Sequence, residues 1–220
     1  AGADVIELGV PFSDPMADGP VIQRSSERAL ARGAGLRYVL EAVEVFRQQD
    51  DTTPIVLMGY LNPVEIHGAE RFAREAVADG VLLVDLPPEE AEETRAVFNR
   101  EGLVLIALAS PTTSPERLRM LCDTAQGYLY YVSFAGVTGA SDRLDTAAAG
   151  ERLKQLQAGS RVPVVAGFGI RDADSARAMA TDADGVVVGS ALVAALAEAG
   201  TDAPSRASAF LAPLRAALDA

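Results

Sequence analysis

Short apolar runs rich in β-branched residues recur along the chain and alternate with longer stretches of mixed polarity. A run of this kind is typical of a strand buried on both faces, as the strands of a parallel sheet are. The pattern predicts seven such strands, at residues 4–8, 54–60, 81–86, 103–109, 128–133, 162–166 and 185–188.

The stretches between these runs predict helices, because their apolar residues recur three or four positions apart and so form one stripe. One stripe consists of Leu36, Val39, Leu40, Val43 and Phe46. A shorter stripe, just before the run at 81–86, consists of Phe72, Ala76 and Val77.

Polar residues mark two of the predicted helix starts. Ser114 is followed by Pro115, the expected order of an N-cap and a first helical residue. Asp172 is placed to cap the helix that carries Ala176 and Met179. Both helices are therefore expected to begin at these positions.

Strand and helix alternation over 220 residues predicts an α/β protein, either a (β/α)8 TIM barrel or a doubly wound sheet. A doubly wound nucleotide-binding fold would carry a G-x-G-x-x-G fingerprint after an early strand, and Leu8-Gly9-Val10-Pro11 lacks it. We therefore expect a barrel with seven of its eight strands in this chain. Because strand-like sequence begins at Asp4, we expect a single domain over residues 1–220 that lacks the first βα unit through an N-terminal truncation.

The charge of the chain restricts its partners. A net charge of −12 would be repelled by a nucleic-acid backbone and by an anionic membrane surface, so neither is expected as a partner. Cys122 is the only cysteine, which excludes an intrachain disulfide and suits a reducing compartment. We expect a cytoplasmic protein.

Two carboxylates at the ends of one proline-rich loop are candidates for chemistry. Glu7 lies near the end of the first predicted strand and shares a strand face with Val5. Asp18 closes the loop that follows and is held in an Asp-Gly-Pro turn. From position alone, Glu7 is either catalytic or a structural charge that pairs with an arginine or reaches water. Asp18 is either functional or a turn residue bonded to its own backbone.

Three glycine clusters follow predicted strands later in the chain. Glycines allow backbone N–H groups to approach an anion, and a helix N-terminus adds partial positive charge. Phosphate sites of barrels commonly follow strands 7 and 8. The clusters therefore predict a phosphate site, and they lie at Gly136–Gly139, Gly167–Gly169 and Gly189-Ser190.

Residue counts exclude two rival mechanisms within this chain. A Schiff-base aldolase needs an inward lysine on a strand, whereas Lys154, the only lysine, lies in a predicted outer helix. A metal-dependent aldolase or epimerase usually needs several histidines. His67 is the only one and is interpreted as a solvated residue of a loop or a helix start. No metal is expected, and proton transfer by carboxylates remains.

The run GADVIELGVPFSDPMADGP at residues 2–20 closely resembles the signature of the tryptophan synthase α subunit family. The resemblance continues in order along the chain, through MGYLNP at 58–63, DLP at 85–87, GYLYYVS at 127–133, GVTG at 136–139, GFGI at 167–170 and GSA at 189–191. It implies a (β/α)8 barrel and a lyase that cleaves indole-3-glycerol phosphate to indole and glyceraldehyde 3-phosphate in L-tryptophan biosynthesis.

The resemblance also implies roles for individual residues. Glu7 matches the catalytic glutamate, which would move protons, and Asp18 matches the catalytic aspartate, which would bind the indole N–H and stabilise positive charge. The implied substrate-binding residues are Tyr130, Thr138, Gly139, Gly169, Gly189 and Ser190.

The implied partner is a tryptophan synthase β subunit in an α2β2 heterotetramer. The α subunit would need no cofactor, and pyridoxal phosphate would be bound only by the β subunit. Two alternatives stay open. The first is a stand-alone indole-3-glycerol-phosphate lyase, and the second is an inactive truncated fragment that only binds or activates a β subunit.

Overall fold

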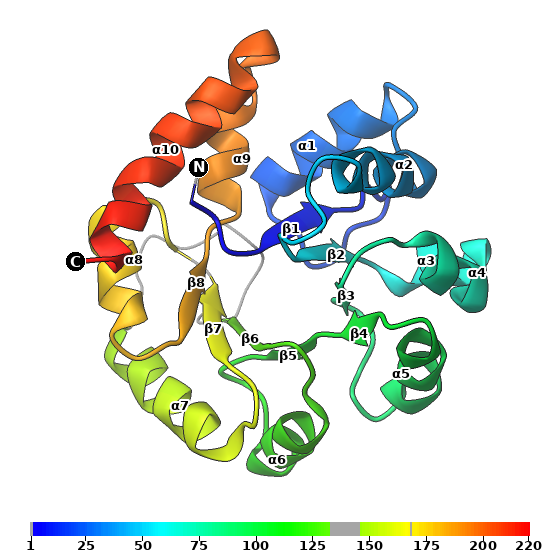
Figure 1. Ribbon diagram of the computed structural model, residues 1–220. Coiled ribbons are helices and arrows are strands. Elements are labelled where there is room, and N and C mark those ends of the chain that lie inside the picture. The colour runs from blue at the N-terminus through cyan, green and yellow to red at the C-terminus, as the bar shows by residue number, and fades with distance from the viewer. Residues whose placement is uncertain (1, 133–145, 168) are drawn as a thin grey trace. The chain divides into compact units, whose positions relative to one another are not determined.

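The computed structural model describes residues 2–132, 146–167 and 169–220 (Figure 1). Its strands are β1 (Ile6–Gly9), β2 (Ile55–Gly59), β3 (Gly80–Leu83), β4 (Val104–Leu105), β5 (Ala107–Ala109), β6 (Leu129–Val132), β7 (Val164–Gly167) and β8 (Gly185–Val187). Its helices are α1 (Pro20–Leu30), α2 (Leu36–Arg47), α3 (Leu61–His67), α4 (Ala69–Glu75), α5 (Ala91–Arg100), α6 (Pro115–Thr124), α7 (Thr146–Gly159), α8 (Ala173–Ala180), α9 (Ser190–Leu196) and α10 (Ala203–Leu218), with a 3-10 turn, η1, at Gly200–Asp202.

The strands form two four-stranded sheets, in the orders β1-β2-β3-β4 and β5-β6-β7-β8. Strands β1 to β4 pair in parallel, and so do strands β6 to β8. All seven predicted runs carry strand, which confirms the strand prediction. The run 103–109 is divided, however, because its first part pairs with β3 and its second part lies beside β6.

Two compact units follow this division. One contains residues 4–16 and 26–107, and the other contains residues 1–3, 17–25 and 108–220. That the whole chain forms a single domain stays a prediction.

The core of the first unit lies between its sheet and helices α2 to α5. Ile6 and Leu8 of β1 pack on it, together with Ile55 and Leu57 of β2. From the predicted stripe of α2, Val39, Leu40 and Val43 are buried. The stripe is therefore confirmed, and it covers one face of the sheet with apolar side chains.

The stripe predicted before β3 is wrong at its last position. Phe72 and Ala76 are buried as expected, but Val77 is 50% exposed. The reason is that α4 ends at Glu75 and the backbone of Ala76 leaves the helical conformation. The carbonyl of Val77 instead accepts a hydrogen bond from Arg47.

Both predicted helix caps are confirmed. The Ser114 hydroxyl accepts a hydrogen bond from the Arg117 N–H at 3.3 Å, and Pro115 is the first residue of α6. Asp172 and Ser175 form a capping box at the start of α8. The hydrogen bonds that Ser175 donates lower the pKa of Asp172, so the cap is held by a carboxylate.

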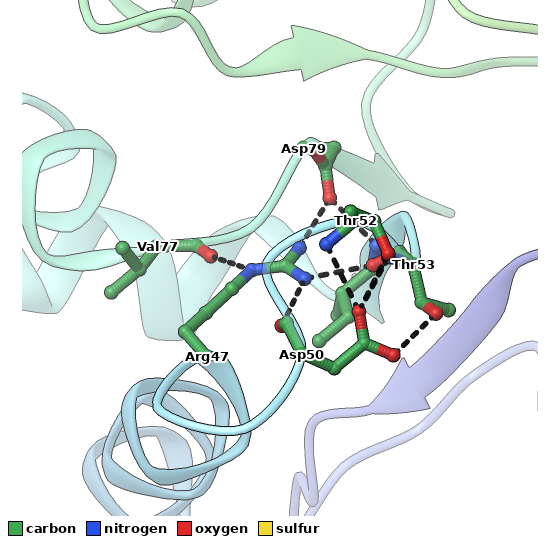
Figure 2. A network of polar contacts seen from close by, with 7 residues as sticks. Arg47, Asp50, Thr52, Thr53, Val77 and Asp79 are labelled. Atoms are coloured by element: carbon green, nitrogen blue, oxygen red, sulfur yellow. Dashed lines mark hydrogen bonds and ion pairs between the residues drawn. The ribbon is translucent and has the colours of Figure 1, made fainter.

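A polar network at the amino ends of β2 and β3 joins three segments of the first unit (Figure 2). The Arg47 guanidinium donates to the carbonyls of Val77 at 3.1 Å, Asp50 at 3.2 Å and Thr53 at 2.8 Å. It also forms an ion pair with Asp79. One side chain at the end of α2 thus binds the loop before β2 and the loop before β3.

Two carboxylates complete this network. Asp79 accepts the N–H of Ile55 at 2.7 Å, which ties the start of β2 to the start of β3. Asp50 accepts the hydroxyl of Thr53 at 2.6 Å and the N–H groups of Thr53 and Thr52 at 2.8 and 2.9 Å. These bonds, led by the Thr53 hydroxyl, hold the pKa of Asp50 well below its usual range.

Replacing Arg47 with alanine is expected to destabilise the protein by about 2–4 kcal/mol, because several hydrogen bonds to a largely buried charged group are lost together. Urea unfolding measures the change. Arg71→Ala is the matched control, since Arg71 is 56% exposed and forms an ion pair with Glu75 one turn away on the same helix. The control should lose less than about 1 kcal/mol. Equal losses of unfolding free energy in Arg47→Ala and Arg71→Ala would contradict a stabilising role for the network.

Among the described residues, no helix is long and apolar enough to cross a membrane.

Candidate active site

Glu7 lies on β1 and faces away from the packed core of the first unit. Its neighbours along the strand, Ile6 and Leu8, pack on the helices. Because side chains alternate along a strand, Glu7 points to the opposite face of the sheet. The prediction that Ile6 and Leu8 share one face is thereby confirmed, and the opposite orientation of Glu7 follows from the alternation.

The register of the sheet places an apolar residue of β2 opposite Glu7. Glu7 lies opposite Val56 of β2, which in turn lies opposite Gly80 of β3. Val56 is 3% exposed, whereas Glu7 is half-buried. A half-buried carboxyl group beside an apolar strand is a candidate for proton transfer, because partial burial favours its neutral, proton-donating form.

The loop after β1 is anchored at its first residues and exposed further on. The Val10 N–H donates to the Met58 carbonyl at 2.8 Å, and the rings of Phe12 and Tyr60 lie 5.3 Å apart between centroids. Met16, by contrast, is 77% exposed. The root of the loop is therefore fixed on β2 of the same unit.

Asp18 lies at the other end of the loop, two residues before Pro20 begins α1. Gln23 reaches back from the first turn of that helix and donates from Nε2 to the Asp18 carbonyl at 2.8 Å. The Gln23 N–H donates to the Gly19 carbonyl at 3.0 Å. The backbone of this turn is thus bonded to α1, and the carboxylate is half-buried. Glu7 and Asp18 belong to different compact units.

Tyr130 is held in β6 of the second unit and is 6% exposed. Val132, two residues further along β6, lies opposite Gly167 at the end of β7. A Cβ atom on Gly167 would overlap the Tyr130 hydroxyl, so only glycine leaves room for this ring. The pair fixes where the tyrosine side chain lies relative to the end of β7.

Two of the predicted phosphate-binding segments follow adjacent parallel strands. Gly169 follows β7 and has φ +73°, a conformation that favours glycine. Gly189 and Ser190 follow β8, whose Val187 pairs with Gly167. The carboxyl ends of parallel neighbours meet at one sheet edge, so these two segments lie at the same edge.

Ser190 carries a feature that a ligand would explain. Its Oγ is buried and has no hydrogen-bond partner within the part of the chain that the structure describes. A buried hydroxyl without a partner is unfavourable by about 1–3 kcal/mol. The hydroxyl is therefore available to an oxygen-rich ligand beside the glycines.

Thr138 and Gly139, together with the Gly136–Gly139 cluster, lie outside the described residues.

The residues considered for rival chemistry are engaged elsewhere. Lys154 lies on α7, as predicted, near Glu151 and Asp182. The interpretation of His67 as a solvated loop or helix-start residue is wrong. His67 ends α3, its side chain is only 14% exposed, and its Nε2 lies 2.7 Å from a Glu75 oxygen. Across residues 2–132, 146–167 and 169–220, no group of three or more His, Cys, Asp or Glu side chains is arranged to hold a metal ion.

Sequence reasoning assigned no role to Asp85, which follows β3 directly. Its Oδ1 accepts the N–H of Leu61 at 2.8 Å, a contact between residues 24 positions apart. The available signal was a carboxylate just past a predicted strand, followed by Leu86 and Pro87.

Comparison with known proteins identifies relatives along nearly the whole chain. A family model described as "Tryptophan synthase alpha chain" matches residues 1–217. The tryptophan synthase alpha chain of Xanthomonas euvesicatoria pv. vesicatoria (strain 85-10) is 77% identical, and the match covers 100% of this chain and 84% of that relative. The corresponding protein of Xanthomonas campestris pv. campestris (strain B100) is 74% identical, with 100% and 83% covered.

Solved structures agree with this match. Tryptophan synthase subunit alpha from Legionella pneumophila str. Paris has a TM-score of 0.90 and 46% identity, with 99% of this chain and 82% of that chain covered. A structure of the tryptophan synthase α2β2 complex from Pyrococcus furiosus has a TM-score of 0.86 and 40% identity, with 96% and 86% covered. The prediction of the (β/α)8 barrel class is confirmed by this likeness.

Proposed function

The chain belongs to the tryptophan synthase alpha chain family, and from that premise we propose that Glu7 and Asp18 carry out its chemistry. The activity is a lyase reaction of L-tryptophan biosynthesis, the cleavage of indole-3-glycerol phosphate to indole and glyceraldehyde 3-phosphate. The partner is the tryptophan synthase β subunit, as in the α2β2 complex from Pyrococcus furiosus. The observation that carries the assignment to Glu7 is its position on β1, facing away from the packed core.

Glu7 moves two protons in this proposal. As the carboxylic acid, it protonates C3 of the indole ring, which converts the ring into an electron-accepting iminium. As the carboxylate, it then takes the proton of the C3′ hydroxyl. The electron pair of the C3–C3′ bond returns to the ring, indole leaves with the new C3–H, and the C3′ carbon becomes the aldehyde of glyceraldehyde 3-phosphate.

Asp18 stabilises the intermediate cation. Its carboxylate accepts a hydrogen bond from the indole N–H and lies near the positive charge that protonation at C3 creates. A fixed negative charge at that point favours the transition state over the neutral substrate. The bonds from Gln23 to the Asp18 and Gly19 carbonyls support this role, because they keep the turn in one conformation.

The remaining candidate residues bind the substrate. Tyr130, buried on β6, forms a wall of the indole pocket. Gly169, Gly189 and Ser190 bind the phosphate group, supported by their common sheet edge and by the buried Ser190 hydroxyl. Thr138 and Gly139 are proposed for substrate binding on the resemblance of their GVTG segment alone.

The chain itself is proposed to need no cofactor, with pyridoxal phosphate bound only by the β subunit. Carboxylate proton transfer supports this, because the indole ring serves as its own electron sink. A cytoplasmic location is likewise proposed from the biosynthetic role of the family and the single cysteine, which suits a reducing compartment.

Indole release measured on the purified chain tests the function. The chain alone should release indole and glyceraldehyde 3-phosphate from indole-3-glycerol phosphate, and an added β subunit should accelerate the release. Release without acceleration would favour the stand-alone lyase. Absence of release, together with no thermal stabilisation by glycerol 3-phosphate, would favour the inactive fragment.

Ser190→Ala is expected to raise KM for indole-3-glycerol phosphate about tenfold and to change kcat less than about twofold, because one hydrogen bond to the phosphate is worth roughly 1.4 kcal/mol in binding. Ser205→Ala is the matched control, since the Ser205 hydroxyl on α10 donates to the Asp202 carbonyl of η1. Steady-state kinetics compares the two. An unchanged KM in Ser190→Ala would remove Ser190 from the phosphate site.

A further inference from the structure

Asp85 makes a long-range contact from the end of β3 to the start of α3. Its Oδ1 accepts the N–H of Leu61 at 2.8 Å, and Leu61 is the first residue of that helix. A hydrogen bond from a backbone N–H to a carboxylate is roughly twice as strong as one between neutral groups. Asp85 is half-buried, so the bond is partly shielded from water.

This bond fixes a short corner between β2 and α3, formed by residues 59–61. The Val84 N–H donates to the Gly59 carbonyl at 3.0 Å, which holds the first residue of the corner on β3. The Asp85 carboxylate holds the last residue of the corner, Leu61, by accepting its N–H. Tyr60 lies between them in an extended conformation, with φ −120° and ψ 153°, and is 5% exposed. The corner is therefore bonded to the end of β3 on both sides of Tyr60.

The corner in turn supports the loop that leaves Glu7. The Val10 N–H donates to the carbonyl of Met58, just before the corner, at 2.8 Å. A Cβ atom on Gly59 would lie 3.2 Å from the Val10 Cβ, so the two backbones approach closely. Phe12 packs on Tyr60 with ring centroids 5.3 Å apart. Contacts of both Val10 and Phe12 thus depend on where residues 58–60 lie.

We propose that Asp85 is a positioning residue for the catalytic loop, acting through its bond to Leu61 on the corner that holds Val10 and Phe12. The proposal rests on the function assigned above, because it gives that loop a role in the reaction. Glu7 is three residues before Val10 on the same backbone, and its strand is paired with β2 up to Gly9 and Met58. A shift of the corner therefore shifts Val10 and, through it, the β1 backbone that includes Glu7. A displacement of about 1 Å at a reacting group can lower a rate by roughly a hundredfold.

The bond can be removed from either partner. Asp85→Ala removes the acceptor, and Asp85→Asn is the conservative variant because an amide oxygen still accepts the Leu61 N–H. Leu61→Pro removes the donor. Proline suits a first helical position, and the extended Tyr60 is compatible with a following proline. Leu61→Ala keeps the N–H and measures the packing contribution of the leucine side chain.

Kinetics of indole release tests the consequence for catalysis. In protein that unfolds cooperatively, Asp85→Ala and Leu61→Pro are each expected to lower kcat about tenfold to a hundredfold. KM should stay within about twofold, since the proposed phosphate residues follow β7 and β8. Asp85→Asn should retain most of the wild-type kcat. The double variant Asp85→Ala/Leu61→Pro should have a kcat no lower than that of the less active single variant, because both changes remove the same hydrogen bond. Wild-type kcat in both single variants, or losses that multiply in the double variant, would overturn the proposal.

Amide hydrogen exchange tests the positioning without using activity. Asp85→Ala should raise the exchange rate of the Val10 amide about tenfold or more, and the Leu129 amide, which donates to the Pro163 carbonyl in the other unit, should be unchanged. If wild type released no indole but Val10 exchange rose, the assigned function would fail while the positioning stood. An unchanged Val10 rate in Asp85→Ala and Leu61→Pro would contradict the positioning itself.

Discussion

Replacing Glu7 with glutamine is expected to lower kcat for indole release by a factor of about 10³ or more, because the amide can neither donate the proton to indole C3 nor accept the one from the C3′ hydroxyl. Both proton transfers of the cleavage depend on this one carboxyl group. Glutamine keeps the shape of the side chain on β1, so the sheet face beside Val56 should pack as before.

Two controls isolate the chemical effect. Glu44→Gln changes an exposed carboxylate on α2 in the same unit and should leave kcat unchanged. Thermal stabilisation of Glu7→Gln by glycerol 3-phosphate should equal that of wild type, since the proposed phosphate residues are untouched. A folded Glu7→Gln protein that released indole at the wild-type rate would exclude Glu7 as the proton-transfer group.

Asp18→Asn is expected to lower kcat about a hundredfold, a smaller loss than that of Glu7→Gln. The amide oxygen of asparagine still accepts the indole N–H, so the substrate is still oriented. The negative charge that stabilises the iminium is lost, and this interaction exists only in the transition state and the intermediate. KM should therefore change much less than kcat.

Asp14→Asn is the matched control for Asp18, because Asp14 is an exposed carboxylate of the same loop whose recorded bond is from the neighbouring Ser13 hydroxyl. It should retain kcat within about twofold. Equal losses in Asp14→Asn and Asp18→Asn would mean that the loop responds to charge in general, and the specific role of Asp18 would then be wrong.

Local patterns predicted the elements of this fold well where neighbours in sequence decide the structure. The apolar runs, the α2 stripe and the caps at Ser114 and Asp172 depend on residues within a few positions of one another. The division of the run 103–109 does not, because it depends on which strand pairs with each half. The bond from Arg47 to the Val77 carbonyl, between residues thirty positions apart, likewise has no local signal.

The residues of the candidate site also divide into those that local sequence patterns indicate and those that depend on long-range contacts. Glu7 was predicted by the alternation of side chains along its strand, and the glycines after β7 and β8 by their positions after apolar runs. The positioning role of Asp85 could not be predicted. Its bond to Leu61 joins the segment after β3 to the first residue of α3, and no sequence spacing indicates a contact between residues 24 positions apart. The room that Gly167 leaves for Tyr130 is a contact of the same kind, between neighbouring strands.

Proton exchange at indole C3 tests most directly the claim that Glu7 protonates the ring while Asp18 holds the charge. Indole is incubated in D2O with the enzyme and glycerol 3-phosphate, and loss of the C3 proton signal is followed by NMR. The account predicts rapid exchange with wild type, none above the uncatalysed rate with Glu7→Gln, and slowed exchange with Asp18→Asn. Exchange at the wild-type rate with Glu7→Gln would contradict it.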